Sequence, residues 1–270
     1  MRMCVQLAAA HGASSHWVAQ RDGFVVNDPA RDEALRKAAR RNSMKALIVE
    51  IDSPGGTFVG GEALYNQLRS LAREKPVVAV MGGTATSAAY MAAIGTSRVF
   101  ARNGTITGSI GVIMQTADIT GMLEKLGIKP ETVKSGPLKA QPNPMESFLP
   151  AARDATEEVV GDLYAIFVDM VATRREIDRD KVLTLADGRV FSGRQAHQVG
   201  LVDAIGGVVE ARSWLEENHQ INASLPLRNL DVHDNDEFWS NLIDSALGKT
   251  LFPERLRLDG VLSVWQPKLK

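Results

Sequence analysis

Two loops of this sequence carry residues that could bind and attack a carbonyl group. Segments 53–56 (Ser-Pro-Gly-Gly) and 82–90 (Gly-Gly-Thr-Ala-Thr-Ser-Ala-Ala-Tyr) each follow an apolar run that predicts a buried strand. Consecutive glycines let backbone N–H groups come close to a substrate oxygen, as an oxyanion hole requires. Ser87 stands where a turn enters a helix, so its hydroxyl would be exposed and the N–H of Ala88 would be a further donor. Each pattern alone is more typical of a turn or a helix cap.

A serine hydroxyl needs a neighbouring base before it becomes a good nucleophile. The histidines all lie outside residues 17–196, where the two loops are found: His11, His16, His197, His219 and His233. A Ser-His-Asp triad remains an alternative, because triad members can be far apart in sequence, but it has little support. A lysine can replace histidine when its surroundings lower its pKa toward neutrality. Lys139 is the first candidate for this base, and Lys134 is its close competitor.

Composition narrows the classes of function. The chain has 270 residues, 44% of them hydrophobic, which is enough for a large core. Lys and Arg number 31 against 32 Asp and Glu, so no long-range field favours nucleic acid or an anionic membrane. The single Cys4 rules out an internal disulfide. No cluster of His and Cys suggests a metal, and the expected chemistry needs no cofactor.

Short apolar runs alternate with helical patterns, which predicts an α/β fold around a mostly parallel sheet. Expected strands cover residues 45–51, 77–81, 98–101 and 110–114, with a glycine turn at 82–83. Expected helices cover 61–74, 119–126, 154–177, 193–200 and 207–218. Ligands bind at the carboxyl ends of the strands in such sheets, so a site is expected at the loops that follow residues 51 and 81.

The chain is expected to divide into three parts. Residues 1–24 form a segment of unclear role, 25–219 form the main domain, and 220–270 form an extension with an amphipathic helix around 239–247. No window approaches the roughly 18 to 20 apolar residues that cross a bilayer, so the chain as given is expected to be soluble.

Several motifs, in one order, resemble a known family. They are Ile51-Asp52-Ser53-Pro54-Gly55-Gly56, Ser87 with Tyr90, Thr107-Gly108-Ser109-Ile110-Gly111-Val112, Lys134-Ser135-Gly136 with Lys139, Gly188-Arg189-Val190-Phe191-Ser192-Gly193 and Gly200-Leu201-Val202-Asp203. From about residue 45 to 207 the chain is similar to serine peptidases of the signal peptide peptidase A family, in the crotonase and Clp-protease superfamily. The resemblance implies a crotonase/ClpP-like fold of repeated ββα units, with a mostly parallel sheet and flanking helices.

The resemblance also implies a role for particular residues. Ser87 would be the nucleophile and Lys139, about fifty residues downstream, the general base, with Ser109 holding the lysine amine. The N–H groups of Gly55 or Gly56 and of Ala88 would form the oxyanion hole. Family members cleave apolar peptides, including spent signal peptides, without metal or cofactor, so residues 25–219 would be a peptidase domain.

Family members assemble as rings or bowls in which neighbouring subunits complete the dyad. The resemblance therefore implies a homo-oligomer with active sites at subunit interfaces, and the 154–177 helix is one expected contact. Most members are associated with the bacterial inner membrane through an N-terminal helix and have a complete first strand before the catalytic core, and residues 1–24 match neither feature.

The chain departs from the family at two positions. It has Ala88-Ala89 where glycine commonly follows the nucleophile, and Ala140 where aspartate often follows the lysine. Backbone N–H donors survive an alanine at 88 provided that φ is negative there.

Two other functions remain open. A crotonase-type acyl-CoA enzyme would share the fold and the oxyanion hole, and would use a carboxylate such as Glu62 instead of the dyad. A non-catalytic scaffold is the third reading, and the presence of both dyad residues argues against it.

Overall fold

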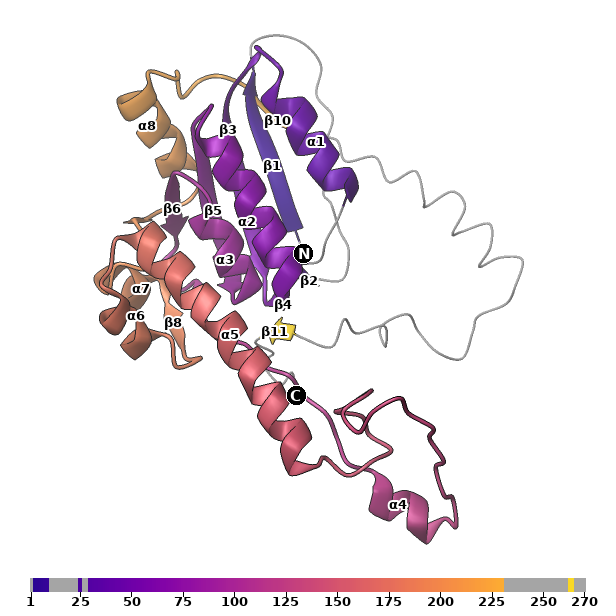
Figure 1. Cartoon of the computed structure of the whole chain (residues 1–270). Coiled ribbons are helices and arrows are strands. Elements are labelled where there is room, and N and C mark those ends of the chain that lie inside the picture. The colour runs from indigo at the N-terminus through magenta and orange to yellow at the C-terminus, as the bar shows by residue number, and fades with distance from the viewer. Residues whose placement is uncertain (1, 10–23, 26–28, 231–261, 265–270) are drawn as a thin grey trace, which may run out of the picture.

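The computed structural model describes residues 2–9, 24–25, 29–230 and 262–264. The strands of the main sheet are β1 (Arg2–Ala9), β3 (Met44–Ser53), β5 (Val77–Thr86), β6 (Arg98–Ala101), β7 (Ile106–Gly108), β8 (Val190–Ser192), β9 (Ala204–Ile205) and β10 (Leu227–Asn229). Within this described part they form one sheet in the order β10-β1-β3-β5-β6-β9, while β7 pairs with β5 and β8 pairs with β7 (Figure 1). A smaller sheet contains β4 (Gly55–Thr57), flanked by β2 (Phe24–Val25) and β11 (Leu262–Val264).

Helices cover both faces of the main sheet. They are α1 (Pro29–Ala39), α2 (Phe58–Ala72), α3 (Ala88–Ile94), α4 (Thr120–Lys125), α5 (Pro150–Arg175), α6 (Arg179–Leu185), α7 (Gly193–Gln198) and α8 (Val208–His219). Successive side chains of a strand point to opposite faces, so β3 contributes Leu47 and Val49 to the core beneath α1, α2, α3 and α5. Ile48 of the same strand packs toward α8 on the other face.

The expected fold class is confirmed. Strands β3, β5, β6 and β9 run parallel, as do β5 and β7, whereas β1 is antiparallel to both β3 and β10. The result is a mixed, mostly parallel, curled sheet with flanking helices, consistent with a crotonase/ClpP-like α/β fold. The carboxyl ends of β3 and β5 lie side by side, with Ser53 paired to Ala85. The two segments singled out in the sequence therefore meet at one edge. The first, expected as a loop and called the glycine loop below, is mostly strand, because Ser53 ends β3 and Gly55 begins β4.

Most expected elements are present, and two need correction. The strand at 98–101 and the long helix of the second half are found as β6 and α5. The expected glycine turn is wrong, because β5 continues through Gly82 and Gly83 and pairs its last three residues with β7. The expected strand at 110–114 is also wrong. Its predecessor β7 ends where Gly108 and Ser109 adopt left-handed φ values of 81° and 52°.

Residues 111–149, called the arm below, extend away from the sheet together with the first half of α5 (Figure 1). No residue from 111 to 151 is buried. The arm exposes a series of large apolar side chains: Ile113, Met122, Leu126, Ile128, Val133, Leu138, Met145 and Leu149. This segment therefore has no core of its own.

The three-part division stays a prediction. Strand β1 lies before the expected boundary at residue 25 and β10 lies after residue 219, yet both pair in the main sheet. The expectation that residues 1–24 do not match a first strand is therefore wrong, because β1 pairs with β3 along its length. The amphipathic helix expected at 239–247 lies outside the described residues. Among the helices that the structure describes, none combines the length and the apolarity needed to cross a bilayer.

Candidate active site

Ser87 stands between β5 and α3 in an unusual backbone conformation. Its φ is 57° and its ψ is −125°, a combination that non-glycine residues avoid and that costs about 1–3 kcal/mol. The Ser87 N–H donates to Gly108 O at 2.8 Å, and Ser87 O accepts from the N–H of Met91 at 2.9 Å. Such strain persists only where surrounding structure holds it, and it clusters at active sites. The expected exposure of its hydroxyl is wrong for the single chain, because the residue is packed between β5 and α3 and is only 1% exposed.

Small residues allow the helix after Ser87 to pack closely. Ala88 and Ala89 are fully buried as the first residues of α3, and neither has a positive φ. Gly61 of α2 makes room for them, since a Cβ on Gly61 would lie 2.9 Å from that of Ala88. The alanines that replace the family's glycines are thus accommodated, and the Ala88 N–H keeps its place at the start of the helix.

The glycine loop after β3 is tied to the segment of Ser87. Thr86 Oγ1 donates to Pro54 O at 2.8 Å. Ser53 Oγ accepts from the Gly55 N–H at 3.3 Å and donates to Gly55 O at 3.2 Å. Gly55 has a φ of 125°, which side-chain-bearing residues rarely adopt. The structure therefore brings Ser87, the glycine loop and Ala88 together.

Ser109 lies next to this group. It follows Gly108, whose carbonyl binds the Ser87 N–H, and its own N–H donates to Arg189 O at 2.8 Å. Its side chain is at the border of burial, with the residue 9% exposed.

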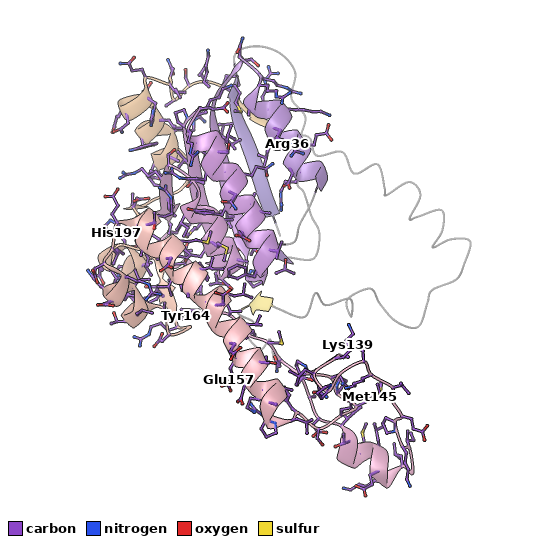
Figure 2. All side chains as sticks on the ribbon, in the orientation of Figure 1. Arg36, Lys139, Met145, Glu157, Tyr164 and His197 are labelled. Atoms are coloured by element: carbon purple, nitrogen blue, oxygen red, sulfur yellow. The ribbon has the colours of Figure 1, made fainter. Side chains whose placement is uncertain are left out.

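The two candidate lysines differ in their surroundings. Lys139 is exposed on the arm, away from the main sheet (Figure 2). Lys134 is half-buried and forms an ion pair with Glu146, which also accepts from Gln141 Nε2 at 2.6 Å. The Lys134 amine is therefore already held by a carboxylate of the same arm. These contacts favour Lys139 over Lys134 as the base, although one chain does not bring Lys139 to Ser87.

A small apolar hollow lies between the arm and the start of α5. It has a volume of about 160 Å³, and Met114, Leu138, Ala152 and Val159 are among the residues that line it. Its lining does not include Ser87. Among the described residues, no group of three or more His, Cys, Asp or Glu could hold a metal ion.

Sequence reasoning missed the hydroxyls of Ser53 and Thr86, both buried and both bonded to the glycine loop. Their positions beside Gly55 and Ser87 were visible in the sequence. Only the pairing of β3 with β5 shows that the two loops are in contact.

A family model, described as peptidase family S49, matches residues 69–222. The chain belongs to peptidase family S49. The match includes Ser87, Ser109 and Lys139 and begins after the glycine loop at 53–56. This confirms the resemblance seen in the motifs.

Relatives carry names of the same kind. The chain is 39% identical over 178 residues to a protein of Synechocystis sp. named as a protease, covering 66% of this chain and 64% of that protein. It is 34% identical over 199 residues to the chloroplastic serine protease SPPA of Arabidopsis thaliana, covering 72% of this chain and 28% of that protein. A protein of Enterococcus faecium named as signal peptide peptidase SppA is 30% identical over 233 residues, covering 86% and 67%.

The S49 chain described here thus spans less than two thirds of the first two relatives. Membership of the family and the names of these relatives support a peptidase function.

Proposed function

We propose that this chain is a serine endopeptidase that hydrolyses apolar peptides, such as cleaved signal peptides, through a dyad of Ser87 and Lys139. The observation that carries the proposal is the strained Ser87, held at the start of α3 beside a glycine loop. A serine at such a strand-to-helix turn can present its hydroxyl to a carbonyl while the next N–H faces the developing oxyanion. Membership of family S49 supports the same reading.

In the proposed mechanism, the neutral amine of Lys139 accepts the proton of Ser87 Oγ as that oxygen attacks the peptide carbonyl carbon. The resulting ammonium protonates the leaving amine as the C–N bond breaks, which leaves an acyl-enzyme. Water, deprotonated by the same amine, then attacks the ester carbon. The bond between that carbon and Ser87 Oγ breaks, and the ammonium returns its proton to Ser87 Oγ.

The proposed oxyanion donors are the N–H groups of Ala88 and Gly56. The Gly55 N–H already donates to Ser53 Oγ, and both glycines are in β4, so Gly56 is proposed for this role with Gly55 as the alternative. Donors fixed before the reaction stabilise the charge that develops in the transition state.

We further propose that Lys139 reaches Ser87 of a neighbouring copy in a homo-oligomer. Lys139 is exposed on an arm that has no core and displays many apolar side chains. A neighbouring copy would cover these side chains, and the Ser109 hydroxyl would meet the incoming amine. The first half of α5, which extends along the arm, would contribute to the same contact.

The test is cleavage of an apolar fluorogenic peptide by the wild type, Ser87→Ala and Lys139→Ala from about pH 6 to pH 10. We expect wild-type activity to increase with pH, because only the neutral amine accepts a proton, and both variants to fall to background. Lys129→Ala, which removes another lysine of the arm, is the matched control and should keep its activity.

Two results would argue against the dyad. Normal cleavage by Ser87→Ala or Lys139→Ala would refute the assignment directly. A wild type that never cleaves peptides but binds acyl-CoA would instead indicate the crotonase-type alternative, with Glu62 as the carboxylate to test.

A further inference from the structure

Two buried threonine hydroxyls near the proposed nucleophile donate to backbone carbonyl groups. One bond joins two strands, and the other joins the segment of Ser87 to the glycine loop. Thr107 Oγ1 donates to Ala85 O at 2.7 Å and so joins β7 to its neighbour β5. Thr86 Oγ1 donates to Pro54 O at 2.8 Å. This second bond joins the residue directly before Ser87 to the glycine loop after β3.

The Pro54–Gly55 peptide is held at both of its polar ends. Its C=O accepts from Thr86 Oγ1, and its N–H donates to Ser53 Oγ at 3.3 Å. Glycine moves between backbone conformations more easily than other residues do, and Gly55 has a positive φ of 125°. Rotation of this peptide would change the direction of the next N–H, that of Gly56. The two hydroxyls therefore oppose this rotation from the β3 and β5 side, in addition to the pairing of β4 with β2 and β11.

We propose that Thr86 is a positioning residue that couples the conformation of Ser87 to the orientation of the oxyanion loop, residues 53–56. The inference rests on the proposed function, because the loop needs a fixed orientation only if it binds an oxyanion. An oxyanion hole is effective because its donors are aimed before charge develops. Thr86 is fully buried and Pro54 is half-buried, so a side chain without a hydroxyl at position 86 would remove the only donor that the protein is seen to offer to Pro54 O among the described residues.

The experiment compares Thr86→Val, which removes the hydroxyl at nearly constant shape, with Thr86→Ser, which keeps a donor. Thr107→Val is the matched control, because it removes an equally buried hydroxyl that does not contact the loop. Each variant is measured for kcat and KM, for affinity toward a peptide boronate that forms a tetrahedral adduct with serine, and for thermal midpoint. A boronate adduct resembles the transition state, whereas the bound peptide resembles the ground state.

We expect Thr86→Val to lower kcat about 10-fold to 100-fold, less than the roughly 100-fold to 1,000-fold effect of deleting an oxyanion donor itself. KM should change little, boronate affinity should fall by a factor similar to that of kcat, and Thr86→Ser should recover most of the loss. Thr107→Val should lower the thermal midpoint but keep kcat and boronate affinity.

Equal losses of kcat in Thr86→Val and Thr107→Val, or a rise in KM alone, would overturn the inference. If the valine variant does not fold, Thr86→Cys supplies the same comparison with a much weaker donor. Ser87→Ala, assayed in parallel, tests the proposed function separately. Normal activity of Ser87→Ala would refute the dyad. An inactive Ser87→Ala together with a fully active Thr86→Val would leave the dyad standing and refute only the role of Thr86.

Discussion

At the scale of single residues, the site depends on two serines whose strained conformations support each other. Ser87 and Ser109 both have positive φ, and Gly108 between their segments accepts the Ser87 N–H. A Cβ on Gly108 would lie 2.6 Å from the ring of Phe191, so only glycine fits there without a shift. One strained residue thus positions the other, and neither conformation follows from local sequence preference.

Tyr90 gives a stability prediction that belongs to one side chain. It is fully buried in α3, and its hydroxyl donates to Leu201 O at 2.9 Å. Tyr90→Phe leaves that carbonyl without the bond, so we expect a loss of about 1–3 kcal/mol in the free energy of unfolding at neutral pH. The measurement is urea unfolding of both proteins at about pH 8.

The same substitution should change the response to alkaline pH. Burial raises the pKa of the Tyr90 phenol well above its usual range. This contribution to stability is fully present below about pH 10, where unfolded tyrosine ionises, and is lost as pH rises through the raised pKa. The deficit of Tyr90→Phe should therefore shrink near pH 11. A deficit that stays constant or grows would contradict this. Tyr164→Phe, which removes a bond to Ala186 O from a half-buried tyrosine, should lose less at neutral pH.

At the scale of elements, sequence patterns predicted the local structure well and the pairings poorly. The strand at 98–101 and the helix capped by Ser192 follow from an apolar run and a capping box. The course of β5 beyond residue 81 is decided by its pairing with β7, a contact that no local pattern contains. An apolar run at 110–114 resembles a strand, but the chain has already turned at Gly108 and Ser109. Local motifs were enough to predict the glycine loop and the nucleophile. The hydroxyl groups that bind the loop could not be predicted, because their contacts depend on the pairing of β3 with β5.

The arm contains an ion pair that encloses the segment of Lys139. Glu146 contacts both Lys134 and Gln141, which closes residues 134–146 into a loop. We expect Glu146→Gln to open this loop, to speed tryptic cleavage at Lys139 and to lower kcat several-fold. The thermal midpoint should barely change, because ion pairs near the surface contribute little to stability and no residue from 111 to 151 is buried.

The pH response of this loop follows from the same pair. The Lys134 ammonium holds the pKa of the Glu146 carboxyl below its usual range. The contact is therefore present above about pH 4, the ordinary range for glutamate, and is lost as pH falls through the lowered pKa. Glu131→Gln, which makes the same charge change at an exposed arm position, is the control. Equal tryptic sensitivity of the two variants would show that Glu146 does not hold the loop.

At the scale of the whole molecule, the described residues form a body with a buried core and an arm without one. The body binds the glycine loop, Ser87 and Ser109 into one rigid group. The arm carries Lys139 and exposes apolar side chains such as Leu126 and Val133, which is unusual for a surface facing only water. Sequence alone could not place Lys139 relative to Ser87, because a segment without buried residues gains its position from whatever covers it.

Mixing two inactive variants tests whether neighbouring copies share the site. Ser87→Ala keeps Lys139, and Lys139→Ala keeps Ser87, so a mixed assembly would contain some intact pairs if each dyad spans two copies. In a closed ring with random neighbours, equal mixing restores about one quarter of the sites. We therefore expect co-expressed or co-refolded mixtures to recover about that fraction of wild-type peptide cleavage. The double variant Ser87→Ala/Lys139→Ala, mixed with either single variant, should recover nothing. If the mixed assemblies have the expected mass in solution but their peptide cleavage stays at background, the dyad lies within one chain. The arm would then have to fold back onto its own body.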